Sequence, residues 1–136
     1  MSAPEPLAAL VRAGQPQNCR PCERHLLTAG AWARLPDALA ADGALLALWG
    51  EPGMVHALFH ERGNGPLLAS VAAADGRYAA LSPACPVAAG FERAARDLWG
   101  LWAENGTDPR PWMNHGHWPF DAPLSGRAVR RSAPPD

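Results

Sequence analysis

The sequence lacks any long apolar run and any excess of charge of one sign. No stretch approaches the roughly 18 consecutive apolar residues of a membrane-spanning helix, and the N-terminus has no basic, apolar, small-residue leader. We therefore expect no direct insertion into a membrane and no secretion by that route. The formal net charge is −1 and no basic stripe is visible. This balance argues against nucleic acid and anionic membrane surfaces as partners.

Cysteines are few, and the familiar catalytic fingerprints are missing. The chain has three cysteines, an odd number without a secretion signal, which indicates reduced thiols in a cytosol. It has no glycine-rich phosphate loop, no Gly-x-Ser-x-Gly motif and no nucleotide-binding fingerprint. The sequence therefore predicts no active site in this chain and no cofactor.

What is present is enough apolar material for one domain of ordinary size. Apolar residues make up 48% of the 136 residues and charged residues 18%, a composition typical of a folded chain. Residues 1–30 are interpreted as a partly flexible N-terminal segment with a short helix over 7–11. Residues 31–127 are predicted to form the folded domain, and 128–136, which are rich in proline and small residues, a flexible tail or linker.

The pattern within the folded part predicts a sheet covered by helices. Apolar residues recur at helical spacing from Trp32 to Leu39, and Asp42-Gly43 ends that helix. Four strands follow, separated by turn sequences, at 44–49, 54–60, 67–73 and 78–81. An antiparallel sheet needs a covered face, so we predict a two-layer α+β fold with a mainly antiparallel sheet, covered by this helix and a second one.

The second helix is predicted from residue 91 onward, with an end near Asn105-Gly106. On a helical wheel its apolar residues share one face and its polar residues the opposite face. The apolar set is Phe91, Ala95, Leu98 and Trp102, and the polar set is Glu92, Arg93, Arg96, Asp97 and Gly100. The polar face is predicted to be solvated or to contact a neighbouring protein.

An irregular arm, residues 106–124, follows the helix. Its prolines at 109, 111 and 119 remove backbone donors, while Trp112 and Trp118 supply large apolar surfaces. Such a segment needs something to lie against, so we predict an extended C-terminal docking arm.

Helix and arm together carry a family resemblance. The run Glu92-Arg93-x-x-x-Asp97-Leu98-Trp99-Gly100, then Asp108-Pro109-Arg110-Pro111, then Trp118-Pro119 and Pro123-Leu124, resembles the signature of the C-subunit family of NADH:quinone oxidoreductase (respiratory complex I). The same domain opens the large subunit of formate-hydrogenlyase-type, membrane-bound [NiFe] hydrogenases. The resemblance covers roughly residues 30 to 127, with departures at Ala94 and Gly106.

The resemblance implies a non-catalytic assembly domain within an oxidoreductase complex, either an NADH dehydrogenase or a hydrogenase. Its partners would be the large catalytic subunit and the iron–sulfur subunit. Its location would be cytoplasmic, peripheral to the inner face of the cell membrane through the complex. The partner-binding residues would be Glu92, Arg93, Asp97, Asp108, Arg110, Trp112, Trp118 and Pro119.

Two alternatives remain open at the level of sequence. Cys19, Cys22 and His25 have a spacing that suits zinc, but a structural zinc site needs four ligands. The segment is therefore either a set of incidental packing residues, a metal-binding module completed by a partner chain, or a redox pair. A free-standing enzyme using the histidines is the other alternative, although no complete constellation is visible.

Overall fold

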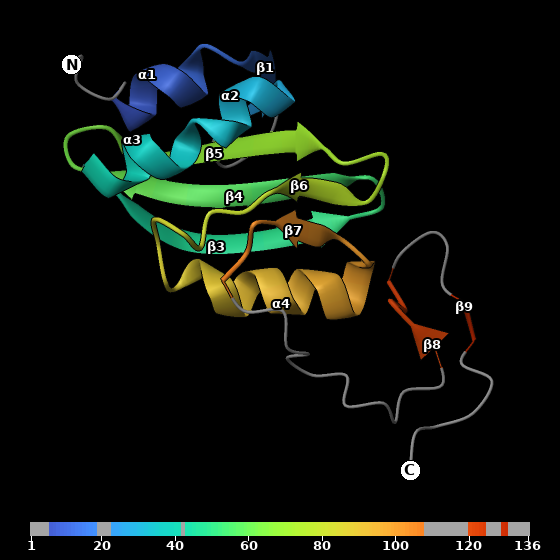
Figure 1. Ribbon diagram of the computed structural model, residues 1–136. Helices are drawn as coiled ribbons and strands as arrows, with labels where there is room; N and C mark the ends of the chain where they lie inside the picture. The colour runs from blue at the N-terminus through green and yellow to red at the C-terminus, as the bar shows by residue number, and fades with distance from the viewer. Residues whose placement is uncertain (1–5, 19–22, 42, 108–119, 125–128, 131–136) are drawn as a thin grey trace.

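A five-stranded sheet forms the centre of the fold (Figure 1). The computed structural model describes residues 6–18, 23–41, 43–107, 120–124 and 129–130. The strand order in the sheet is β1-β2-β5-β4-β3. The strands are β1 (Gln15–Gln17), β2 (Arg24–Leu27), β3 (Ala44–Glu51), β4 (Met54–Glu61) and β5 (Gly65–Ala72).

Strands β3, β4 and β5 form the antiparallel meander that the sequence predicts. The turns between them contain Gly53 and Gly63, whose φ angles of 76° and 83° suit glycine. Strand β2 pairs with β5 in parallel, and β1 pairs with β2 antiparallel. The sheet is thus mixed but mainly antiparallel.

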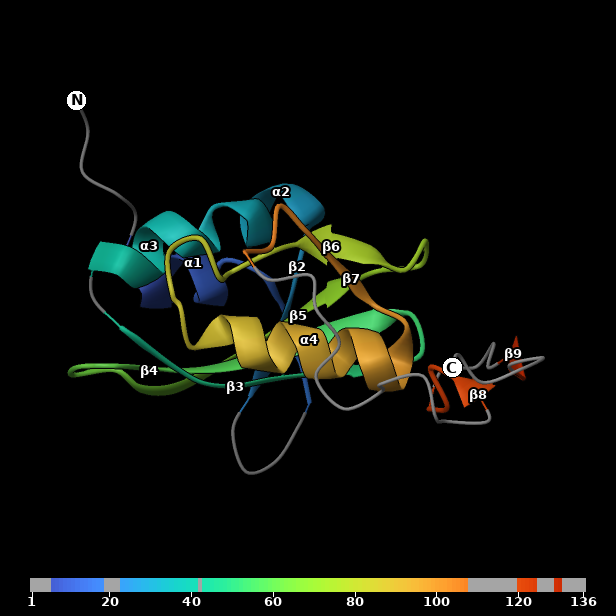
Figure 2. The same cartoon turned by 60° about the horizontal axis from the view of Figure 1, so that its bottom comes forward.

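The helices of the described residues all lie on one face of this sheet, so the two-layer α+β fold is confirmed (Figure 2). They are α1 (Leu7–Arg12), α2 (Ala29–Ala33), α3 (Leu35–Ala41) and α4 (Ala88–Trp99). The single helix predicted around Trp32 is in fact two, α2 and α3, separated at Arg34. Pro36 lies in the first turn of α3, where its missing N–H leaves no helical hydrogen bond unmade.

The hydrophobic core lies between the sheet and the helices. Its largest fully buried side chains are Trp32, Phe59, Leu7, Leu10, Leu35, Leu81 and Leu101. Because α1, β1 and β2 all come from the first thirty residues, the packed body extends further toward the N-terminus than residue 31.

The predicted fourth strand exists, but its predicted pairing is wrong. β6 (Arg77–Ala79) pairs in parallel with β7 (Trp102–Glu104) to form a separate two-stranded sheet. It cannot pair with β5, because one edge of β5 is taken by β4 and the other by β2. Gly76 makes the exit from the main sheet, and its carbonyl accepts a hydrogen bond from the Trp102 N–H at 2.7 Å.

Helix α4 also ends earlier than predicted. Gly100 adopts a left-handed conformation, with φ 69°, and stops the helix. Trp102 therefore belongs to β7 and not to the helix. Further along, β8 (Phe120–Asp121) and β9 (Val129–Arg130) form a short antiparallel ladder. Residues 108–119 of the predicted arm lie outside the described residues.

Candidate functional site

Helix α4 is oriented differently from the sequence-based expectation. Its buried residues are Ala88, Glu92, Ala95 and Asp97, while Leu98 is only half-buried. Of the two alternatives predicted for the polar face, solvation is therefore wrong for Glu92 and Asp97, which are 5% and 6% exposed, and contact with a neighbouring protein stays a prediction. Arg93 is half-buried on the same helix.

Glu92 is buried because it satisfies the backbone of the preceding loop. Its Oε2 accepts a hydrogen bond from the Leu81 N–H at 2.6 Å, and it also hydrogen-bonds to the backbone and the hydroxyl of Ser82. Ser82 Oγ in turn accepts from the Thr107 N–H at 3.1 Å. Burial raises the pKa of Glu92, and these hydrogen bonds act against that rise. The carboxyl group of Glu92 thus connects α4, through Ser82, to Thr107 at the start of the predicted arm.

The chain returns to the other end of the same helix. The Leu124 N–H donates to the Leu98 carbonyl at 2.8 Å, one of the last carbonyls of α4 that no helical N–H can reach. Ala122 lies beside Gly100, since a Cβ added to that glycine would be 3.2 Å from the Ala122 Cβ. Residues 108–119 are thus flanked on both sides by residues fixed to α4 or to the loop before it.

One exposed aromatic residue lies beside this helix. Trp102 is 50% exposed, and the Arg96 guanidinium carbon lies 4.0 Å from the centre of its ring. Sequence reasoning assigned Trp102 to the apolar face of the helix and so missed it as a surface residue; the signal that could have corrected this is Gly100, a helix-ending residue two positions earlier. The predicted contacts Asp108, Arg110, Trp112, Trp118 and Pro119 lie outside the described residues.

The suggested metal module has one described member. His25 lies on β2, and its Nε2 is 3.0 Å from the Glu23 Oε1. Cys19 and Cys22 lie outside the described residues. Over the described part of the chain, no group of three or more histidine, cysteine, aspartate or glutamate side chains converges as a metal site.

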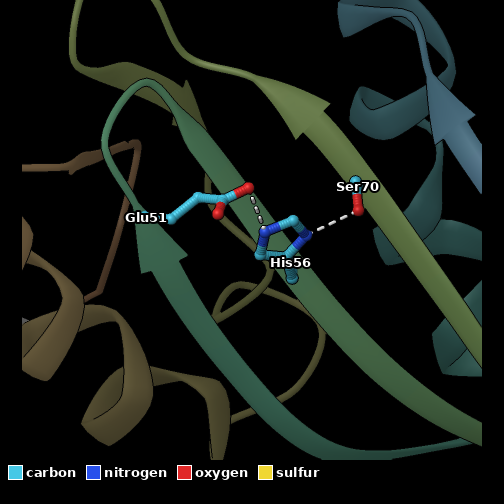
Figure 3. Close-up of polar contacts among 3 residues, drawn as sticks. All are labelled: Glu51, His56 and Ser70. Carbon is cyan, nitrogen blue, oxygen red and sulfur yellow. Dashed lines mark hydrogen bonds and ion pairs between the residues drawn. The ribbon is translucent and has the colours of Figure 1, made fainter. Parts of the chain in front are cut away.

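A polar network that sequence reasoning missed lies on the sheet face away from the helices (Figure 3). His56 on β4 has its Nδ1 2.6 Å from the Ser70 Oγ on β5 and its Nε2 3.0 Å from the Glu51 Oε1 on β3. A carboxylate only accepts, so neutral His56 donates from Nε2 to Glu51 and accepts the Ser70 hydroxyl at Nδ1. One tautomer therefore satisfies all three groups.

The arrangement has the members of a nucleophilic triad, but the serine is inaccessible. Ser70 is 0% exposed and His56 4% exposed, so no substrate carbonyl reaches the hydroxyl in this conformation. Trp49 covers the imidazole, with ring centroids 5.5 Å apart. The network therefore stabilises the sheet as a set of satisfied buried polar groups.

Protonation of this network is expected to destabilise the fold. Burial lowers the pKa of His56, Arg24 lowers it further, and Glu51 acts in the opposite direction. Because the folded state holds the imidazole neutral, the unfolded state binds the extra proton first as the pH falls below about 6.5. The contribution of neutral His56 to the free energy of unfolding is therefore fully present above that pH, and it is lost as the pH falls through the folded-state pKa.

This gives a prediction for the variant His56→Gln, which cannot titrate. Urea unfolding at a series of pH values should show the wild-type midpoint falling between roughly pH 7 and pH 5. The variant should lack that component of the fall, although its midpoint at pH 7 is expected to be lower because the fit to Ser70 and Glu51 is disturbed. Parallel pH profiles for the two proteins would contradict the assignment to His56.

No protein family model matches the chain, and no curated protein is significantly similar to it. Among the helices that the structure describes, none combines the length and apolar character needed to cross a membrane.

Proposed function

We propose that this chain is a non-catalytic assembly and docking domain of a complex I-like NADH:quinone oxidoreductase or of a membrane-bound [NiFe] hydrogenase of the formate-hydrogenlyase type. It would contact the large catalytic subunit through residues 106–124 and the surface beside α4, and lie near the iron–sulfur subunit. Its location would be cytoplasmic and peripheral to the inner face of the membrane through the complex. The chain would supply no cofactor of its own.

The observation that carries the proposal is the pair of attachments on either side of residues 108–119. Thr107 is held by Ser82, which Glu92 of α4 holds in turn, and Leu124 is held by the last turn of α4. A docking segment loses less conformational entropy on binding when its flanks are already fixed. The attachments therefore support a rigid platform that presents a segment to a partner.

The residues of α4 that carry the family resemblance have structural positions within the platform. Glu92 and Asp97 are buried, and Gly100 ends the helix in a left-handed conformation. In this proposal they fix the platform, and the contact residues are those of the arm. Trp102 adds an exposed aromatic residue with the half-buried Arg96 over its ring, and both are residue types that dominate interface energies.

Affinity capture of the full chain from its native cell extract, followed by mass spectrometry, tests the proposal. Wild-type protein is expected to recover a hydrogenase or complex I large subunit, and the partner recovered decides between the two complexes. Trp118→Ala and Trp102→Ala should each reduce that recovery by roughly tenfold or more if they are interface anchors. Both variants are expected to remain folded by circular dichroism.

Val87→Ala is a suitable control, because Val87 is 58% exposed and lies before the start of α4. It should leave the recovery unchanged. Recovery of the same large subunit at wild-type levels by Trp118→Ala and Trp102→Ala would remove the docking surface from consideration. Failure to recover any subunit of either complex would count against the proposal as a whole.

A further inference from the structure

The two edges of the main sheet are protected to different degrees. β1, at one edge, has three residues including Pro16, and short strands with proline are poor templates for pairing. β3, at the other edge, has eight residues, of which 44–50 carry no charge. Within the described residues, β3 makes backbone ladder contacts with β4 alone. In that part of the chain, its outer edge is therefore an unpaired strand edge.

Helix α4 overhangs this edge. In Figure 1 it lies beyond β3, and Figure 2 shows that it lies on the core side of the sheet with the other helices. α4 packs on β3, and Gly50 permits the close approach, because a Cβ there would be 2.4 Å from Leu101 Cδ1 and 3.1 Å from Trp99 Cγ. Helix α4 therefore covers the core side of the position that a sixth strand would occupy.

The side chains around that place are apolar. Phe91, Ala94 and Leu98 lie on the flank of α4 opposite the one that carries Glu92 and Arg96, and all three are half-buried. Leu46 and Trp49 of β3 are 50% and 40% exposed. The only charge on the strand is Glu51, at its C-terminal end. We call the outer edge of β3 together with Phe91, Ala94 and Leu98 the β3 slot.

Two copies of the chain do not fit together through their β3 slots. Two β3 strands pairing antiparallel about a two-fold axis would put both α4 helices on the same side, each above the other copy's β3. Neighbouring strands are only about 4.8 Å apart, whereas packed helices need roughly 8–10 Å between axes. Because α4 extends past the edge of β3, a strand can pair with β3 only if it has no helix packed beside it on the core side.

We propose that the β3 slot binds a single extended segment of another protein, which adds to the sheet as a sixth strand. The segment would be apolar on both faces, since one meets α4 and the other lies next to Trp49, and its one charged residue would be a basic one beside Glu51. A β-bulge between Leu45 and Ala47 limits regular pairing to the part of β3 from Ala47 to Glu51. This inference is independent of which complex the chain belongs to.

The test is hydrogen–deuterium exchange on the full chain with a synthetic peptide as probe. The peptide copies residues 44–50 and carries one lysine at each end, so that a basic residue lies beside Glu51 in either strand direction, and it has no attached helix. Adding it should slow exchange of outward-facing amides between Ala47 and Glu51. The same peptide with proline at its centre is the matched control and should have no effect, because proline cannot complete the ladder.

Trp49→Lys should raise the dissociation constant of the peptide by roughly tenfold or more, because it places a charge at the exposed Trp49 position within the pairing part of β3. Ala9→Lys adds the same charge at an exposed site on α1, which packs on β2 and β5 at the other side of the sheet, and should bind as the wild type does. Protection located elsewhere, or binding unaffected by Trp49→Lys, would overturn the proposal. Slow exchange of the outer β3 amides in the free chain at low concentration would also overturn the proposal, because it would indicate that residues 108–119 occupy the slot. Protection that grows with protein concentration alone would also overturn it, by assigning the slot to a second copy.

Discussion

Replacing Trp32 with alanine is expected to lower the free energy of unfolding by about 3–5 kcal/mol, the usual range for a fully buried aromatic residue. Trp32 is 0% exposed. Its Nε1 donates to the Ala79 carbonyl at 2.9 Å, and its ring meets Tyr78 edge to face with centroids 6.5 Å apart. The side chain thus joins the helical layer to β6, so its loss leaves both a cavity and an unpaired carbonyl.

Urea unfolding followed by circular dichroism measures this effect. The midpoint should fall while the slope of free energy against urea stays unchanged, because the extent of surface exposed on unfolding is the same. Trp102→Ala is the matched control, since Trp102 is 50% exposed and its truncation should cost about 1 kcal/mol or less. Equal losses for the two variants would show that Trp32 does not hold the layers together.

Glu92→Ala is expected to have the second largest effect on stability, about 2 kcal/mol at neutral pH. The substitution leaves the buried Leu81 N–H without an acceptor, and an unsatisfied buried donor costs about 1–3 kcal/mol. It also releases Ser82, which holds Thr107. The exchange of the Thr107 amide should therefore accelerate more than that of the main sheet, which distinguishes local release from a general loss of stability.

Glu92→Gln isolates the charge, because glutamine keeps an acceptor for Leu81 but does not ionise. The raised pKa of Glu92 means that the folded state prefers the protonated carboxyl. The contribution of protonated Glu92 to the free energy of unfolding is thus fully present below about pH 4.5, and it is lost as the pH rises through the folded-state pKa. The variant should match the wild type near pH 4 and exceed it at pH 7. A stability difference that is constant from pH 4 to pH 8 would contradict this account of Glu92.

The burial of Glu92 and the hydrogen-bond partners of His56 could not be predicted from the sequence. The apolar and polar faces of α4 were assigned by spacing and residue type, which put Glu92 with the polar residues opposite the apolar face and gave it no reason to be buried. The reason is the Leu81 N–H, eleven residues earlier along the chain, and the loop that brings it there is fixed by tertiary packing. The same limit applies to His56, whose partners Ser70 and Glu51 come from neighbouring strands.

The sequence by itself determined the α+β class, the β3–β4–β5 meander, and the existence of α1 and α4, because alternation, helical spacing and glycine turns are local signals. Only the tertiary structure decided that β2 pairs with the free edge of β5. Because that edge is then occupied, β6 pairs with β7 instead. It also decided that α4 lies over the position beside the outer edge of β3 (Figures 1 and 2). Strand pairing and helix placement depend on which edges and faces remain unoccupied once distant segments have packed, and no local pattern carries that information.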